Sequence, residues 1–257
     1  MQLHADLERR FGGLRRLYGE EGYARLRAAR VAVVGLGGVG SWSAEALARS
    51  GVAGLVLIDF DHVAESNINR QVQALGATLG QAKGEALRAR IADIHPGCDV
   101  TVVDDFVAPD NWPALLPHAV DALVDACDQP RAKRALAAWA LGSGARFVGV
   151  GAAGGKRHAE RVAVADLAEV THDPLLAGLR QRLRKDTVVP RQGRTGLRCV
   201  YSTEPVARPV QACDAPAATD GSLNCSGYGS SVTVTATFGL VAAGEAIAQL
   251  LAGADER

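Results

Sequence analysis

The sequence predicts an α/β protein with a doubly wound, mainly parallel sheet and an appended C-terminal subdomain. Three observations predict this fold. Short apolar runs, several of them rich in β-branched residues, alternate with stretches that have helical apolar spacing, which favours parallel strand pairing. A glycine-rich loop separates the first such strand from the first such helix. The alternation ends near residue 155, and the chain then becomes richer in loops.

The first half of the chain opens with a strand, a glycine turn and a helix. Two further apolar runs follow, the first ending in acidic residues, with a helix between them that stops before Pro96. Right-handed crossovers place helices on both faces of such a sheet and gather the carboxyl ends of its strands on one rim. The predicted strands are 30–34, 55–58 and 100–103, and the predicted helices are 41–50 and 84–94.

The second half continues the alternation and then departs from it. Apolar runs at 121–126 and 147–150 flank a predicted helix at 131–141. Beyond residue 155 we expect a strand at 161–164, a basic helix at 174–185 and loops as far as residue 229. We therefore expect one Rossmann-like domain over residues 1–257. Its parts are a nucleotide-binding core at 10–155, an appended substrate-binding segment at 156–230 and an apolar C-terminal helix at 231–253.

The stretch 232–252 is long enough to cross a membrane, but Glu245 and Gln249 interrupt it. We expect a buried helix and no integral membrane span, and peripheral membrane contact remains open. The N-terminus lacks the apolar stretch of a secretory signal. The five cysteines are an odd number without a Cys-x-x-Cys pair, which indicates a reducing cytoplasm and argues against a zinc ribbon.

The composition excludes a strong overall electrostatic field, because 28 basic residues balance 28 acidic ones. Nucleic-acid contact would therefore be local. Positive charge concentrates in one place, which is a candidate nucleic-acid-docking segment or simply a solvated helix face with a loop. Its members are Arg180, Arg182, Arg184, Lys185, Arg191, Arg194 and Arg198.

The glycine loop is the main chemical signal. Between a strand and a helix, free backbone amides at the positive helix end attract phosphate, and Gly37 and Gly40 leave room for its approach. Asp59 follows the next strand, where a ribose acceptor is expected. A dinucleotide oxidoreductase and a purely structural turn are both open on this pattern. The loop glycines proposed to face the nucleotide are Gly35, Gly37, Gly38 and Gly40.

Residues after Asp59 favour a triphosphate over NAD. Arg70 and Lys83 can neutralise β- and γ-phosphate oxygens and the departing pyrophosphate. Asp128, which follows another predicted strand, could hold Mg²⁺ through oxygen ligation. Taken singly, each cation is typical of a solvated surface, and Asp128 is typical of a helix cap before Pro130. Further candidates for the nucleotide site are Asp61, Asn67 and Gln71.

The order and spacing of these residues resemble the ThiF/MoeB/HesA superfamily of ubiquitin-activating-like adenylating enzymes. The resemblance covers about residues 10–155 and rests on Gly35 to Gly40, Asp59, Asn67, Arg70, Gln71, Lys83 and Asp128. It implies that Asp59 binds the ribose of ATP, that Asn67, Arg70 and Lys83 bind phosphates, that Gln71 supports the site and that Asp128 holds Mg²⁺. It also implies a homodimer in which an N-terminal arginine, Arg16 or secondly Arg10, reaches the partner's site.

Within the superfamily one branch is most similar, the tRNA threonylcarbamoyladenosine dehydratases. The segments that carry this resemblance are 10–13, 16–19, 103–106, 151–155, 173–175, 201–204 and 235–239. The branch implies ATP-dependent cyclisation of threonylcarbamoyladenosine in tRNA, and a sulfur-transfer partner of the cysteine desulfurase type. Activation of a ubiquitin-like or sulfur-carrier protein is the alternative, which the missing Cys-x-x-Cys pairs disfavour. Cys225 is a candidate nucleophile, although unpaired cysteines are usually small buried hydrophobes.

Overall fold

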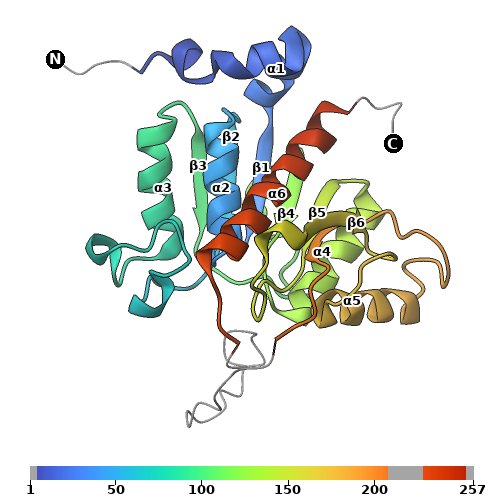
Figure 1. Cartoon of the computed structure of the whole chain (residues 1–257). Helices are drawn as coiled ribbons and strands as arrows, with labels where there is room; N and C mark the ends of the chain where they lie inside the picture. The colour runs from blue at the N-terminus through green and yellow to red at the C-terminus, as the bar shows by residue number, and fades with distance from the viewer. Residues whose placement is uncertain (1–4, 208–227, 253–257) are drawn as a thin grey trace.

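The computed structural model describes residues 5–207 and 228–252 and contains one seven-stranded sheet between two layers of helices (Figure 1). The strand order is β3-β2-β1-β4-β5-β7-β6. All neighbouring strands are parallel except β6 and β7, which confirms the predicted doubly wound, mainly parallel class. The strands are β1 (Arg30–Val34), β2 (Gly54–Ile58), β3 (Asp99–Val103), β4 (Ala122–Asp125), β5 (Arg146–Val150), β6 (Val162–Asp166) and β7 (Arg198–Ser202).

The helices cover both faces of this sheet because the central strands are apolar on both sides. In β1, Val31 and Val33 face one cluster of buried side chains, and Ala32 and Val34 face the other. The first cluster contains residues of α2, α3 and α6, and the second contains residues of α4 and α5. The helices are α1 (Leu7–Ala28), α2 (Gly40–Arg49), α3 (Lys83–Ile94), α4 (Pro130–Ser143), α5 (Pro174–Lys185) and α6 (Val232–Leu251).

The apolar helix α6 lies in the core. It is the one helix among residues 5–207 and 228–252 that is long and apolar enough to cross a membrane, and half of its most apolar window is buried inside the protein. It packs closely on α2 at Gly239, where an added Cβ would lie 2.5 Å from the Val39 carbonyl oxygen. The Ser43 hydroxyl donates to the Gly239 carbonyl at 3.0 Å. Packing against α2 and the sheet therefore accounts for the apolar character of α6.

The structure contains one helix and one strand that the sequence did not predict. Helix α1 buries only Phe11, Tyr23 and Leu26, and its apolar periodicity is diluted by charged residues and broken by Gly19 at φ 73°. Strand β7 lies in a stretch expected to be loops, yet it pairs in parallel with β5 and antiparallel with β6. The chain after residue 155 thus extends the core sheet, whereas its assignment to substrate binding stays a prediction.

The sheet has two chemically different ends. The glycine loop, Asp59, Asp125 and Gly151 lie at or just beyond the carboxyl ends of β1, β2, β4 and β5, so they share one rim. Helix α1 leads into the amino end of β1 and lies across the opposite end of the sheet (Figure 1). Polar groups for a ligand therefore gather at the end of the molecule away from α1.

Candidate functional site

A cleft of about 890 Å³ opens at the carboxyl rim of the sheet. Its walls are the loops that follow β1, β2, β3, β4 and β5, together with residues at the start of α6. This volume lies at the upper end of the range for small-molecule sites, roughly 300–1,000 Å³. The cleft can therefore hold a ligand of nucleotide size and a second reactant beside it.

The glycine loop needs its glycines for different reasons. Gly35 has φ 84°, and its added Cβ would lie 2.9 Å from the Cys127 backbone nitrogen. At Gly40 an added Cβ would lie 1.8 Å from the Gly35 carbonyl oxygen, so this glycine closes the turn on itself and does not line the cleft. Gly37 lines the cleft and has no protein atom within 4 Å of its added Cβ position. Of the two glycines expected to admit phosphate, the geometry supports Gly37, while Gly40 is required by packing.

Asp59 ties the second strand to the glycine loop. Its Oδ2 accepts from the Leu36 backbone N–H at 2.5 Å, and its Oδ1 accepts from the Asp61 N–H at 2.8 Å. Burial raises the pKa of Asp59, although the nearby Lys83 charge acts in the opposite direction. The carboxylate is thereby fixed beside the cleft with acceptor capacity left for a hydroxyl.

Lys83 is the buried cation of the site. It begins α3, its side chain is 7% exposed, and its Nζ lies 2.6 Å from Asp61 Oδ2 and 3.9 Å from Asp59 Oδ1. The cleft lining includes all three side chains. This ammonium lies between two carboxylates, and it can exchange one of them for a phosphate oxygen.

Arg70 lines the same cleft from the segment after β2. Its Nη1 donates to the Ser66 carbonyl at 2.6 Å and to Asn69 Oδ1 at 2.8 Å. Burial lowers the pKa of Arg70, which remains far above neutrality because guanidinium groups stay charged in proteins. The structure therefore brings Arg70, Lys83 and the glycine loop together around one space.

The two amide residues of this segment have different positions. Asn67 is outside the cleft lining, and its Oδ1 accepts from the Ala64 N–H at 3.0 Å, so it caps a short 3₁₀ turn. Gln71 lines the cleft and accepts from Gln73 Nε2 at 3.3 Å. The same Gln73 amide donates to the Leu36 carbonyl at 2.9 Å. Gln73, which sequence reasoning missed, thus links Gln71 to the glycine loop.

A buried ion pair at the end of β4 stabilises the loop that follows this strand. Lys133 Nζ lies 2.8 Å from Asp125 Oδ2, and both side chains are fully buried. Burial alone would lower the pKa of Lys133, but the Asp125 charge raises it above its ordinary value. Asp125 Oδ1 also accepts from the Cys127 N–H at 3.2 Å. This pair fixes the loop that carries Asp128 into the cleft.

Asp128 is a chemically suitable Mg²⁺ ligand beside a triphosphate. Residues 5–207 and 228–252 contain no group of three or more His, Cys, Asp or Glu side chains arranged to hold a metal. Mg²⁺ is commonly bound by one or two carboxylates together with substrate phosphates and water. The Asp128 carboxylate, in the same cleft as Arg70 and Lys83, fits that donor set.

The described cysteines lack the character of activated nucleophiles. Burial raises the pKa of Cys98 to about 11, and it raises the pKa of Cys127 and Cys199 well above the ordinary range. Cys127 lines the cleft, but its thiol donates to Asp125 Oδ1 at 3.0 Å. Cys225, the candidate nucleophile, lies outside the described residues.

The two N-terminal arginines differ in their contacts. Arg10 Nη1 donates to the Asp93 and Ile94 carbonyls, both at 2.7 Å, and so closes the end of α3. Arg16 is exposed on α1, which lies across the end of the sheet where β1 begins (Figure 1), and the cleft lies at the opposite, carboxyl rim. Arg16 is therefore unable to reach the cleft of its own chain.

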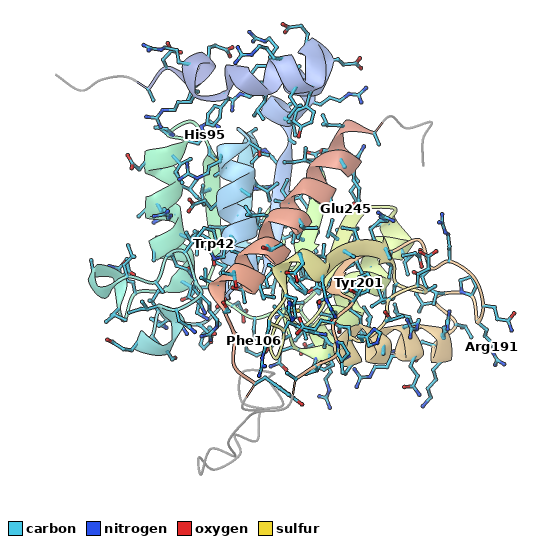
Figure 2. All side chains as sticks on the ribbon, in the orientation of Figure 1. Trp42, His95, Phe106, Arg191, Tyr201 and Glu245 are labelled. Atoms are coloured by element: carbon cyan, nitrogen blue, oxygen red, sulfur yellow. The ribbon has the colours of Figure 1, made fainter. Side chains whose placement is uncertain are left out.

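The residues of the basic segment also differ in their contacts and exposure. Arg180 Nη1 donates to the Leu167 and Val170 carbonyls at 2.9 Å, which gives it a structural contact within its own chain. Arg198 pairs with Glu245 at 2.9 Å, and Arg194 lies 3.5 Å from Glu169. Arg184 is half-buried, whereas Arg182, Lys185 and Arg191 are exposed. Figure 2 shows Arg191 at the outer end of the loop beyond α5.

Three further cleft residues were missed from the sequence. Phe60 and Phe106 are 57% and 63% exposed, and their rings meet edge to face with centroids 6.2 Å apart. Figure 2 places Phe106 at the rim end of the sheet. Arg131, in the first turn of α4, also lines the cleft. The periodicity of apolar residues gives no signal for such residues, because each is isolated in the sequence. Only the tertiary structure brings them to the cleft.

The chain is similar to known proteins over most of its length. The model of the ThiF family matches residues 11–257. A tRNA threonylcarbamoyladenosine dehydratase of Escherichia coli K12 is 44% identical over 253 residues, covering 95% of this chain and 94% of that protein. The crystal structure of the E. coli enzyme in complex with ATP superposes with a TM-score of 0.88 at 41% identity and 99% coverage of both chains. Its complex with AMP has a TM-score of 0.85, with 97% of this chain and 98% of that chain covered.

Proposed function

This chain belongs to the ThiF family, and on that premise we propose that it is an ATP-dependent tRNA threonylcarbamoyladenosine dehydratase. The observation that carries this proposal is one rim cleft that unites Gly37, Asp59, Lys83 and Asp128. The similarity extends over nearly the whole length of relatives with that activity, one of which has been solved with ATP and with AMP. A match confined to the nucleotide-binding core would not indicate which substrate carboxylate is activated. This match also includes the segments after residue 155.

The reaction is activation of a carboxylate followed by ring closure. The threonylcarbamoyl carboxylate attacks the α-phosphate of ATP, and pyrophosphate leaves. A nitrogen or oxygen of the same modification then attacks the activated carbonyl and loses its proton to solvent, and AMP leaves with one former carboxylate oxygen. One water is thereby lost from the nucleoside. Ring closure within one bound group gains the effective concentration of an intramolecular reaction, so an enzyme nucleophile is unnecessary.

The cleft residues have separate roles in this chemistry. Asp59 would accept from the ribose, and the glycine loop would donate backbone amides to phosphate. Arg70 and Lys83 would stabilise the charge that develops on the departing pyrophosphate. Asp128 would hold Mg²⁺, which when bound supplies further positive charge to the phosphates.

A homodimer is part of the proposal. Arg16 is exposed and lies at the end of the sheet away from its own cleft, so a catalytic role for it requires the cleft of a partner subunit. The contacts of Arg10 with α3 make it the weaker candidate. A sulfur-transfer partner is a separate proposal that follows from the family branch.

The deciding experiment is mass spectrometry of nucleosides from tRNA incubated with the protein, ATP and Mg²⁺. We expect a product that has lost one water from threonylcarbamoyladenosine, only when ATP is present. The alternative, activation of a carrier-protein C-terminus, is separated by pyrophosphate exchange. If a small carrier protein stimulates pyrophosphate exchange and modified tRNA does not, the dehydratase assignment is wrong and the chain activates a carrier protein.

Docking of tRNA is expected to depend on those exposed members of the basic segment that take no part in the ion pairs with Glu169 and Glu245. Joint replacement of Arg182, Lys185 and Arg191 by Ala should weaken tRNA binding and reduce its dependence on salt, because fewer phosphate counterions are released. The measurement is the dissociation constant at several salt concentrations. Arg88→Ala, an exposed arginine on α3, is the control. Unchanged affinity and salt slope in the triple variant would move the docking surface elsewhere.

A further inference from the structure

The cleft has two halves that the sheet topology separates. The glycine loop and Asp59, which follow β1 and β2, form the half that suits a nucleotide, on one side of the point where the strand order reverses. The loops after β4 and β5 form the other half, which also includes Leu175 and Tyr228. Under the proposed function, the modified nucleoside must present its carboxylate from this second half, because the first is occupied by ATP.

The second half has few charged groups. Among the described lining residues that follow β4, only Asp128 and Arg131 are ionisable acids or cations. Leu175, Tyr228 and the small residues 151–154 supply the rest of the wall together with the start of α6. With Asp128 assigned to Mg²⁺, Arg131 remains as the cation of this half.

Arg131 differs from the other cleft cations in its contacts. Lys83 is paired with Asp61, and Arg70 donates to Ser66 and Asn69. Arg131 is exposed, and within the described ranges 5–207 and 228–252 its guanidinium has no ion pair or side-chain hydrogen bond. It also sits in the first turn of α4, where the helix dipole disfavours a cation. Neither protein contacts nor helix stability account for a positive charge at this place in the cleft.

We propose that Arg131 binds the carboxylate of the threonylcarbamoyl group and positions it for attack on the α-phosphate. Two anions, the carboxylate and the triphosphate, must approach each other in this reaction, and a guanidinium offset from the phosphate cations lowers that repulsion. Its planar fork also matches a carboxylate with two parallel hydrogen bonds, which a point charge does not. The inference rests on the proposed function and adds the residue that distinguishes modified from unmodified tRNA.

The test compares binding of anticodon stem-loops with and without threonylcarbamoyladenosine, in the presence of a non-hydrolysable ATP analogue. Wild-type protein should prefer the modified stem-loop. In Arg131→Ala we expect that preference to fall roughly tenfold to hundredfold, the loss typical of a charge-assisted contact, with affinity for the unmodified stem-loop unchanged. Arg131→Lys should recover part of the preference. Arg134→Ala, on the same helix but paired with Asp186, is the matched control.

The alternatives give different results. Equal weakening of both stem-loops would show that Arg131 contacts a tRNA phosphodiester, and a raised KM for ATP alone would assign it to the nucleotide phosphates. Either result overturns the proposal. The proposed function fails separately, if wild-type protein and ATP leave the modified nucleoside unchanged in the mass-spectrometric assay.

Discussion

Lys83→Ala should reduce ATP-dependent turnover by roughly a hundredfold to a thousandfold, the loss typical when one charge-stabilising donor is removed from an active site. Its ammonium is buried in the cleft wall, 2.6 Å from Asp61 Oδ2, and no other described cation is placed between Asp59 and Asp61. Because the charge on pyrophosphate develops during attack, the effect should fall mainly on kcat. The measurement is steady-state kinetics with modified tRNA, together with ATP–pyrophosphate exchange.

The control for Lys83 lies on the same helix. Arg88 is an exposed arginine paired with Glu85, one turn or so along α3, and Arg88→Ala should leave kcat within about twofold. Circular dichroism on both variants separates chemistry from folding, since Lys83 also compensates the buried Asp59 carboxylate. A folded Lys83→Ala variant with normal exchange activity would remove Lys83 from the phosphate site.

The core of the fold was predictable because its signals are local. A buried parallel strand is apolar along its length, and the glycine loop marks the junction of β1 with α2. Each expected strand and helix of the first 150 residues is present to within a few residues of its expected bounds. Helix α1 and strand β7 were missed for physical reasons: α1 buries only one narrow line of side chains, and β7 is five residues long inside a stretch rich in polar residues.

The site was predictable in its strand ends and less so in its loops. Asp59 follows a buried strand and Asp128 follows the end of another, so topology alone brings them to one rim. Asn67 could not be judged in this way, because a side chain in an irregular loop can turn into a cleft or cap its own backbone. The same limit applies to Arg180, since its contacts with Leu167 and Val170 depend on where α5 packs.

The glycine loop allows a sharper separation of packing from binding. Gly37→Ala should leave the fold intact, because its added methyl group meets no protein atom within 4 Å and enters the cleft. It should instead obstruct the phosphate, so ATP binding is lost. Gly40→Ala should destabilise the loop itself, because the methyl group would lie 1.8 Å from the Gly35 carbonyl oxygen. Overpacking of this kind typically costs about 1–3 kcal/mol of unfolding free energy.

Thermal unfolding with and without ATP and Mg²⁺ distinguishes the two variants. ATP should raise the Tm of the wild type, because a ligand that binds only the folded state stabilises it. Gly37→Ala should keep the wild-type Tm without ATP and lose the shift, whereas Gly40→Ala should melt several degrees lower, at about 2–4 °C per kcal/mol, even without ATP. Gly142→Ala, at an open position in α4, should retain both the fold and the shift. A normal ATP shift in Gly37→Ala would mean that the phosphates bypass the loop, and the adenylation site would then have to be built from Arg70, Lys83 and Asp128 without it.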